Sequence, residues 1–374
     1  MKFHIPLIAF TLLVAAGLSI EAHALEQIVR PYQSIRSSAM GGVKITTGLY
    51  DENFFGNPAR VTYNPRFRMT LFDPMIEINS TTIDTLGDLL ESGDTVQKIG
   101  SSAGSNNHVR FQTTLPSLYF PVPAEGRTAY AFGLITSTQF DLDLRRTFRI
   151  DPQAFTDIGP AFTVGRRFLN DDRLSVGMTA HFTYRVSTRI DKMSYSFADF
   201  LRSSTLSAKE IGGDGAMLDF DLGAMYRIPH TWKEFEFLGG ASINNLLGGK
   251  YSNIKLHPAE TGNLPIAQPR TFNFGISARR PRLGPFSNFL AALEFTDIGN
   301  NPNGSLFRTV HLGAEARYGM LAPRLGINQG YLAAGLGFLF RFFSLEYATY
   351  GEEMSLNPGG YQDRRHALRI ALQI

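Results

Sequence analysis

The chain has 374 residues, of which 36 are Lys or Arg and 33 are Asp or Glu, so its formal net charge is only +3. The basic residues are interspersed with acidic ones, which excludes the concentrated basic surface typical of nucleic-acid binding. The chain has no cysteine, which excludes disulfides, thiolate metal sites and a lipoprotein anchor. No Walker-type loop, dinucleotide fingerprint or His-Glu-x-x-His motif is present, and we expect neither a metal nor another cofactor.

Residues 1–24 have the pattern of a secretory signal peptide. Lys2 precedes an apolar run from Ile5 to Ile20, and Ala22-His23-Ala24 places small residues around a cleavage site. We therefore expect export and cleavage after Ala24. An uncleaved N-terminal anchor is the alternative, although the apolar run is short for a spanning helix.

Residues 25–66 lack the alternation of β-strands and have the features of a compact, loop-rich unit. We predict a short helix over residues 34–40, ended by Gly41 and Gly42, and a turn at Asn57-Pro58-Ala59. The apolar side chains of this unit need cover, which the inside of a barrel would provide. A mobile periplasmic tail is the alternative, because chain termini are often disordered.

Residues 67–374 alternate between apolar and polar side chains with the two-residue period of β-strands. The last strand puts His366, Leu368, Ile370, Leu372 and Ile374 on one face, and Ala367, Arg369, Ala371 and Gln373 on the other. One face suits lipid and the other suits water. We predict an all-β fold, a transmembrane antiparallel barrel of about fourteen strands. The predicted strands cover residues 67–79, 108–122, 127–147, 158–169, 172–190, 215–229, 234–247, 270–281, 286–297, 306–319, 322–328, 331–340, 341–350 and 363–374.

The connections distinguish a membrane barrel from a soluble β-sandwich, whose strands also alternate. Long connections are predicted at 80–107, 148–157, 191–214, 247–270, 297–305 and 351–364. Short connections fall between them, at 121–127, 170–172, 229–233, 280–286 and 319–322. The short connection at 328–330 is the exception to the alternation. An outer-membrane barrel alternates long outer loops with short periplasmic turns, whereas a sandwich has no reason to do so.

Several local features modify this barrel. Leucine or phenylalanine at three- and four-residue spacing predicts short helices at 84–90 and 197–201, which either pack within the outer loops or shape an outer mouth. Pro74 removes a backbone donor inside the first strand, where we expect a bulge or kink. Membrane barrels carry girdles of aromatic residues at both membrane interfaces. We therefore expect positions near strand ends or on outward faces for Tyr119, Phe120, Tyr130, Phe182, Tyr184, Phe272, Phe274, Phe342, Phe343, Tyr347 and Tyr350.

Two groups of residues that bracket the chain resemble the FadL-like superfamily of outer-membrane barrels. Near the N-terminus they are 38–42, 51–53 and 57–59; near the C-terminus, 325–331, 347–353 and 363–366 are more similar to the PorV and TraF-like branch. The resemblance implies a barrel at 67–374 whose N-terminal segment lies in the lumen as a hatch. We call residues 25–66 the hatch segment. Its signature residues are Met40, Gly41, Gly42, Asn57, Pro58 and Ala59.

The alternation also directs a set of charged residues inward, namely His181, Arg185, Asp219, Asp221, Arg227, Glu294, His311, Glu315, Arg317, Glu346 and Arg369. They either line a polar path and lock the hatch, or are the paired charges that fill any barrel of this width. Asp219 and Asp221 share a face, but no nucleophile motif accompanies them. A triad of Ser175, His181 and Asp219 is excluded, because the first two lie on one strand about 20 Å apart. We expect no enzymatic activity.

The sequence thus predicts a channel in the outer membrane of a Gram-negative bacterium that admits hydrophobic small molecules similar to long-chain fatty acids. The C-terminal resemblance implies an alternative, a non-transporting PorV-like scaffold or shuttle whose outer loops bind proteins of a secretion or surface-assembly system. In either case we expect outer-membrane lipid and the barrel-assembly machinery as partners, and no nucleic acid.

Overall fold

The computed structural model describes residue 30 and residues 32–90, 105–144, 149–169, 171–188, 195–196, 212–254, 263–301, 304–354 and 359–374. The predicted signal peptide at 1–24 and the predicted helix at 197–201 lie outside the described residues.

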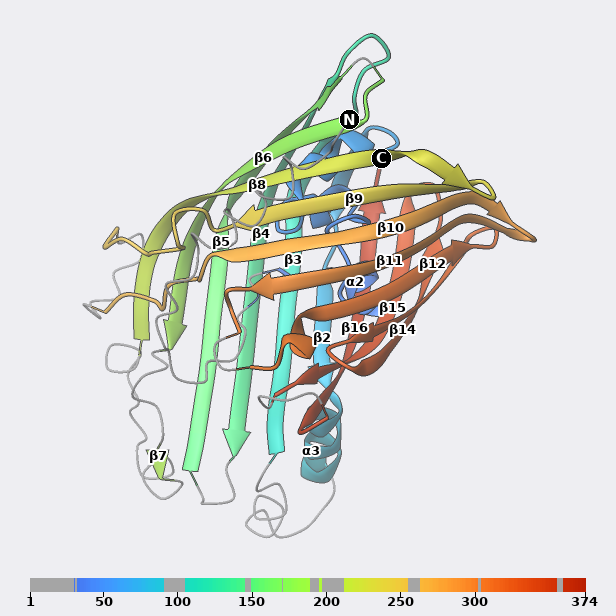
Figure 1. Ribbon diagram of the computed structural model, residues 1–374. Coiled ribbons are helices and arrows are strands. Elements are labelled where there is room, and N and C mark those ends of the chain that lie inside the picture. Colours follow the sequence, from blue (N-terminus) through green and yellow to red (C-terminus); the bar gives the residue numbers. More distant parts are fainter. Residues whose placement is uncertain are drawn as a thin grey trace.

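The strands form a closed antiparallel barrel of fourteen strands (Figure 1), which confirms the predicted fold class. The first strand is divided into β1 (Arg68–Phe72) and β2 (Met75–Asn79), and both parts pair with β16 (Gln362–Gln373) and β3 (Ser105–Phe120). The remaining wall strands are β4 (Thr128–Leu144), β5 (Arg149–Phe168), β6 (Leu174–Thr188), β8 (Gly212–Trp232), β9 (Phe235–Asn244), β10 (Thr271–Leu283), β11 (Phe286–Ile298), β12 (Val310–Arg317), β13 (Leu321–Asn328), β14 (Tyr331–Leu339) and β15 (Phe343–Glu353). The two-residue strand β7 (Tyr195–Ser196) pairs with β5. Every predicted strand is present.

The helices are short. Three lie in the hatch segment, namely α2 (Ile35–Ala39), η1 (Tyr50–Asn53) and η2 (Pro58–Tyr63), while α3 (Ser80–Leu90) covers the predicted helix at 84–90. The helix η4 (Leu306–Thr309) occupies the start of the segment predicted as a strand from 306, so β12 begins at Val310. No helix among the described residues is long and apolar enough to span a membrane.

The predicted alternation gives the barrel an apolar exterior and a polar interior. In β16, Ala367 and Ala371 are buried, whereas Leu368, Ile370 and Leu372 are 41%, 39% and 44% exposed on the outside. Three of the aromatic residues predicted near strand ends or on outward faces are buried, namely Tyr119, Tyr184 and Tyr350, although Tyr119 is next to the end of β3. The hydroxyls of two of them donate to carboxylates, from Tyr184 to Asp214 and from Tyr350 to Glu77.

One predicted long connection, at 148–157, was also wrong, because β5 begins at Arg149. Pro152 there pairs with Leu142 of β4. On the opposite side, the pairing of β5 with β6 begins only at Phe155. Pro152 therefore lies at an edge, where its missing backbone donor has little cost.

The division between β1 and β2 confirms the break predicted at Pro74. Asp73 is buried there, and its carboxylate accepts hydrogen bonds from the Thr113 hydroxyl and the Thr114 backbone N–H, both at 2.7 Å. A buried carboxylate thus replaces backbone pairing at this point of the wall.

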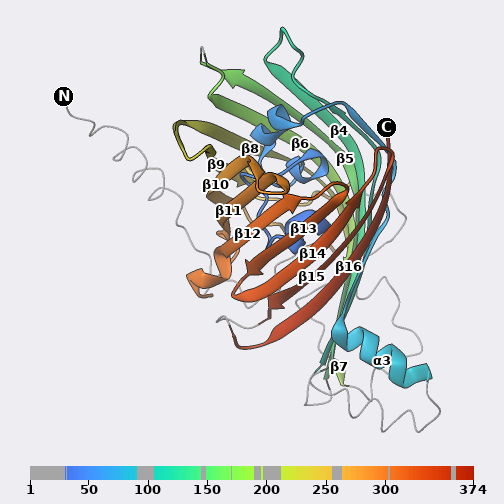
Figure 2. The same cartoon turned by 90° about the vertical axis from the view of Figure 1, so that its right-hand side faces the viewer.

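The hatch segment lies inside the barrel, between β12–β16 on one side and β4–β8 on the other (Figure 2). Phe54 and Val61 pack with Ala129, Ala131 and Ala161 of the wall. Small side chains on the inner face of the wall leave the volume that the hatch fills. Glycines bring the two still closer: a Cβ added at Gly313 of β12 would lie 2.1 Å from the Met40 carbonyl oxygen.

We expect Gly313→Val to displace the hatch from the wall, at a cost of about 1–3 kcal/mol, which is usual for overpacking a tight contact. The check is limited proteolysis of the hatch segment, together with the urea midpoint of unfolding in detergent. Gly239→Val is the matched control, because nothing lies within 4 Å of a Cβ added to this strand glycine. Equal protease sensitivity of the two variants would contradict the close contact.

Candidate functional site

Met40, Gly41 and Gly42 are the first group of signature residues in the hatch. They follow the helix α2, which is capped at both ends. The Ser34 side chain accepts a hydrogen bond from the Ser37 backbone N–H at 3.2 Å and so begins α2. Gly41 and Gly42 have φ values of 69° and 93°, and the Gly42 N–H returns to the Ser37 carbonyl at 2.8 Å. Glycine adopts this left-handed conformation without strain, so these two residues end the helix as predicted.

Asn57, Pro58 and Ala59 are the second group of signature residues. They were predicted as an isolated turn, but they begin the helix η2. The Asn57 side chain accepts from the Ala59 N–H at 3.1 Å, and Pro58 occupies the first helical position. The Asn57 side-chain amide also donates to the Ala224 carbonyl of β8 at 3.0 Å. One side chain therefore caps the helix and joins the hatch to the wall.

Both signatures lie against wall glycines. A Cβ added at Gly223 of β8 would be 2.0 Å from the Asn57 side-chain oxygen, and one at Gly326 of β13 would be 2.4 Å from the Gly41 nitrogen. Glycine at inward positions of the strands was the sequence signal for these contacts.

Glu294 of β11 holds the loop that follows α2. Its carboxylate accepts from the backbone N–H groups of Lys44, Ile45 and Thr46 at 2.7–2.8 Å, and from the Thr46 hydroxyl at 2.7 Å. Successive N–H groups that converge on an anion form a strong, charge-assisted contact. Glu294 is completely buried, so this contact is shielded from water.

Arg36 of α2 connects the hatch to a chain of charges on the wall. Its guanidinium lies 2.9 Å from Glu52 of the hatch and 3.0 Å from Glu315 of β12. Arg324 of β13 continues the chain, at 2.7 Å from Glu315 and 2.6 Å from Glu346 of β15. Each buried charge in this chain is next to an opposite one, which offsets the cost of removing it from water.

A second ion-pair group joins the hatch to the break in the wall. Arg369 of β16 lies 2.9 Å from Asp73 and 3.3 Å from Asp51 of the hatch. The Tyr32 hydroxyl also donates to Asp51. Arg369 therefore depends on both the hatch and the wall for its partners.

The N-terminal end of the hatch is held at Arg30. Its guanidinium lies 2.9 Å from Asp297 and 2.5 Å from Glu352, on two strands at the loop end of the barrel. Glu352 is shared with Arg365 of β16, at 3.3 Å.

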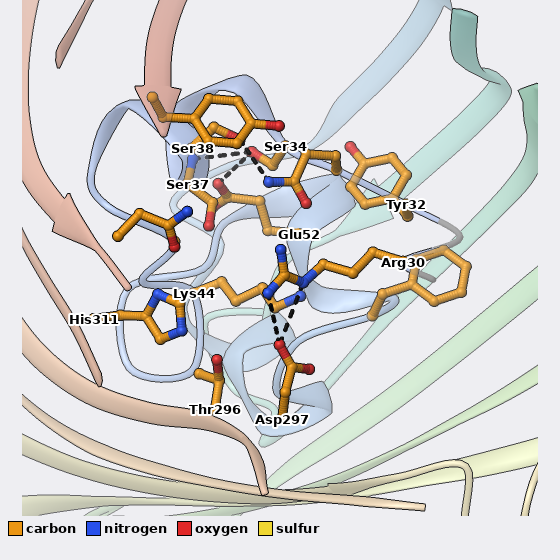
Figure 3. A pocket seen from close by; sticks show the side chains of 15 residues that line it. Arg30, Tyr32, Ser34, Ser37, Ser38, Lys44, Glu52, Thr296, Asp297 and His311 are labelled. Carbon is orange, nitrogen blue, oxygen red and sulfur yellow. Dashed lines mark hydrogen bonds and ion pairs between the residues drawn. The ribbon is translucent and has the colours of Figure 1, made fainter. Parts of the chain in front are cut away.

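A polar cavity with an empty volume of about 460 Å³, its open mouth included, lies between the hatch and these strands (Figure 3). The side chains of Arg30, Lys44, Asp297 and His311 reach it. The His311 Nδ1 lies 2.7 Å from the Gly41 carbonyl oxygen, whereas Nε2 has no hydrogen-bond partner in the part of the chain that is described. Lys44 likewise has no ion-pair partner within 4.0 Å among those residues.

Burial changes the acidity of the hatch side chains. It lowers the pKa of Lys44, because the charged ammonium loses water without gaining a close counter-ion. It lowers the pKa of Arg60 to about 10 and raises the pKa of the Glu52 carboxyl, although Arg36 opposes the latter shift. The hatch is thus polar and desolvated at once.

The fold has known counterparts among solved structures. The P. putida toluene transporter TodX aligns with a TM-score of 0.51 at 9% identity, covering 92% of this chain and 97% of TodX. The monoaromatic hydrocarbon channel CymD aligns with a TM-score of 0.50 at 12% identity, covering 90% of this chain and 96% of CymD. The chain has the FadL-like barrel fold. No family model matches the sequence, and no curated protein matches it either.

In this FadL-like barrel, four of the predicted inward charges make polar contacts with the hatch, namely Glu294, His311, Glu315 and Arg369, and the ring of a fifth residue, His181, lies against Phe55 of the hatch. Glu346 joins them through Arg324, and Arg185 pairs with Asp157 on the neighbouring strand. Arg317 is partly buried near the turn after β12, while Arg227 is exposed and donates to the Asp171 carbonyl beside a short turn. Arg227 therefore lies at the rim and away from the hatch.

Asp219 and Asp221 of β8 hold an outer connection. The Asp219 carboxylate accepts from the N–H groups of Leu247 and Gly249 at 2.8 and 2.7 Å. The Asp221 carboxylate accepts from the Asn245 N–H at 2.8 Å and lies 3.5 Å from His181. These are structural contacts, and among the described residues no group of three or more His, Asp or Glu side chains is arranged so that it could hold a metal ion.

Sequence reasoning missed a buried group at the loop end of the first strands. His108 of β3 lies between Asp141 of β4 and Glu77 of β2, at 2.7 and 2.8 Å. Arg110 and Arg365 approach the same Glu77, at 3.5 and 3.7 Å. The alternation of His108 and Arg110 with Val109 and Phe111 was the signal that would have found it.

We expect Glu294→Gln to loosen residues 43–47 while the barrel stays intact. A neutral amide oxygen accepts more weakly than a carboxylate, and its NH₂ group would face backbone donors, so the local cost is about 2–3 kcal/mol. Hydrogen exchange at the N–H groups of residues 44–46 measures it. Glu234→Gln, at an exposed ion pair with Arg280, is the control, and similar exchange in both variants would count against the contact.

Lys44 should make stability depend on pH on the alkaline side. Its folded pKa is lowered from 10.5. Between the two values the unfolded chain binds the proton that the folded chain has lost, so stability rises with pH across this window. Lys44→Met should remove that rise, as measured by urea midpoints in detergent from pH 7 to about 10.5. The exposed Lys250 provides the control substitution, Lys250→Met.

Proposed function

We propose that this chain is a bacterial outer-membrane channel that admits hydrophobic small molecules, and that the hatch segment is the part that yields during passage. The observation that carries the proposal is a lumen filled by a folded segment of the chain and held by polar contacts inside an apolar-faced barrel. Two proteins that share the fold support the proposal, since TodX is a toluene transporter and CymD is a monoaromatic hydrocarbon channel. The fatty acids expected from the sequence are one member of the proposed ligand class.

The proposed location follows from the exterior of the barrel. Phe111, Phe162 and Leu325 are 49%, 47% and 67% exposed on outward faces, which suits contact with acyl chains. We propose that residues 1–24 direct export and that the barrel-assembly machinery inserts the chain. The scaffold alternative depends on the connections at 80–107, 191–214 and 247–270, large parts of which lie outside the described residues.

The hatch is suited to opening because its contacts with β11–β16 include several ion pairs beside the apolar packing of α2. Water that enters the lumen hydrates both partners of an ion pair, so separating them costs far less than leaving one charge buried alone. Arg369 couples such a movement to the wall. When Asp51 moves away with the hatch, Arg369 keeps Asp73, at the break between β1 and β2, as its main partner. The break is therefore where a side exit would form.

A disulfide between hatch and wall tests whether the hatch must move. The Thr62 hydroxyl of η2 donates to the Ser175 hydroxyl of β6 at 3.1 Å, and the chain has no cysteine that would interfere. We expect the oxidised Thr62→Cys/Ser175→Cys variant to reduce uptake of radiolabelled toluene and oleate to the level of cells without the channel. A reductant should restore uptake.

The control is Thr163→Cys/Thr179→Cys, which joins β5 to β6 at hydroxyls 2.7 Å apart and leaves the hatch free. Its uptake should be the same in both redox states. Normal uptake by the oxidised hatch-to-wall variant would show that passage does not need hatch movement. Absence of uptake by the unmodified protein would overturn the channel itself.

A further inference from the structure

A second pocket lies on the loop side of the barrel and shares no lining residue with the cavity around Lys44. It is bordered by the loop ends of β4, β5 and β6 and by residues 266–269, and we call it the outer pocket. Its empty volume, open mouth included, is about 630 Å³.

One part of the outer pocket is apolar. The Phe155 ring is 8% exposed there and lies near Ile266 and Pro269. The Arg185 guanidinium carbon is 4.7 Å from the centre of that ring, which fixes the ring in place. This part suits the hydrocarbon body of a ligand.

The other part presents amide groups. Gln139, Gln153 and Gln268 all line the pocket. Gln268 is 5% exposed, and its Nε2 has no hydrogen-bond partner in the described ranges of the chain. A buried amide without a partner is costly, so this group marks a position for an acceptor atom from outside the chain.

The charged groups of the outer pocket already have partners. The Arg185 guanidinium donates twice to Asp157, at 2.6 Å in both cases. Asp141 lies 2.7 Å from His108 and accepts from the Gln139 amide at 2.5 Å. A ligand carboxylate would therefore enter without a free counter-charge, which is unfavourable.

We propose that the outer pocket binds a neutral, oxygen-bearing hydrophobic molecule, such as a phenol, alcohol or ketone, in preference to a plain hydrocarbon or a carboxylate. The oxygen accepts from Gln268, and the apolar body packs on Phe155. This inference rests on the proposed channel function and gives its substrate class. It follows the rule that a site with buried polar groups discriminates against a ligand that leaves them unpaired.

The outer pocket also lies close to the end of the hatch. Gln139 accepts a hydrogen bond from Arg110, and the Arg110 Nη2 donates to the Arg30 carbonyl at 3.4 Å. A ligand beside Gln139 is therefore two contacts away from Arg30, which pairs with Asp297 and Glu352.

Three ligands with one skeleton test the inference, namely toluene, p-cresol and p-toluate. Equilibrium dialysis of radiolabelled ligand against the full chain in lipid nanodiscs, corrected for empty nanodiscs, gives each Kd. We expect p-cresol to bind about tenfold more tightly than toluene, the value of roughly one hydrogen bond to a buried donor. We expect p-toluate to bind more weakly than p-cresol.

Gln268→Leu should remove the preference for p-cresol and leave toluene binding unchanged, while Gln268→Asn, which keeps the amide, should retain part of it. Gln362→Leu, at an exposed glutamine, is the control for the same chemical change. Heat-modified migration on gels establishes that each variant is folded.

Equal affinity for toluene and p-cresol, tightest binding of p-toluate, or a preference that survives in Gln268→Leu would each overturn the inference. None of these results would contradict the proposed channel function, which the hatch-to-wall disulfide tests separately.

Discussion

The structure depends on one electrostatic requirement: charges enclosed by a closed barrel must find opposite charges inside it. The hatch contributes Arg30, Arg36, Asp51 and Glu52, and the wall supplies a partner for both arginines, whereas Lys44 is the exception noted above. Glu315 lies between Arg36 and Arg324, so it belongs to the hatch and the wall at once. A rotation of the hatch would leave several charges unpaired together, and this fixes its orientation in the lumen.

The same requirement divides the hatch into two unlike sides. Toward β3–β5, Tyr50, Phe54 and Val61 pack on small wall residues and exclude water. Toward β11–β16, the apolar side chains of Ile35, Ala39, Met40 and Val43 also pack on the wall, but ion pairs and the hydrogen bonds to Glu294 are added to this packing. Water weakens the ion pairs of the second side more than the apolar packing on either side, because apolar burial is strengthened by water and ion pairing is screened by it.

The break between β1 and β2 lies where the wall and the hatch bind the same arginine. Asp73 replaces the backbone pairing of the wall and also binds Arg369, which contacts Asp51 of the hatch. A weak point of the wall and a contact of the hatch therefore share one arginine. On the loop side, the hydrogen bonds from Gln139 through Arg110 to the Arg30 carbonyl connect the outer pocket to the other end of the hatch. Polar contacts thus join the hatch to the outer pocket at Arg30 and to the break in the wall at Asp51.

The sequence by itself determined the barrel, because a two-residue period of side chains and connections of alternating length are local properties that lipid and water select directly. It also determined the end of the first hatch helix, since Gly41 and Gly42 act on their own backbone, whereas the turn predicted at Pro58 proved to be the start of η2. Which charges meet was decided only by the tertiary structure. Glu294 and Lys44 are 250 residues apart in sequence, and Arg30 and Glu352 are 322 apart. Alternation places a side chain inside the barrel but gives neither its height along the strand nor the element opposite it. The missed group of Glu77, His108 and Asp141, the rim position of Arg227 and the burial of Tyr350 all follow from strand register and hatch position, which only the closed barrel fixes.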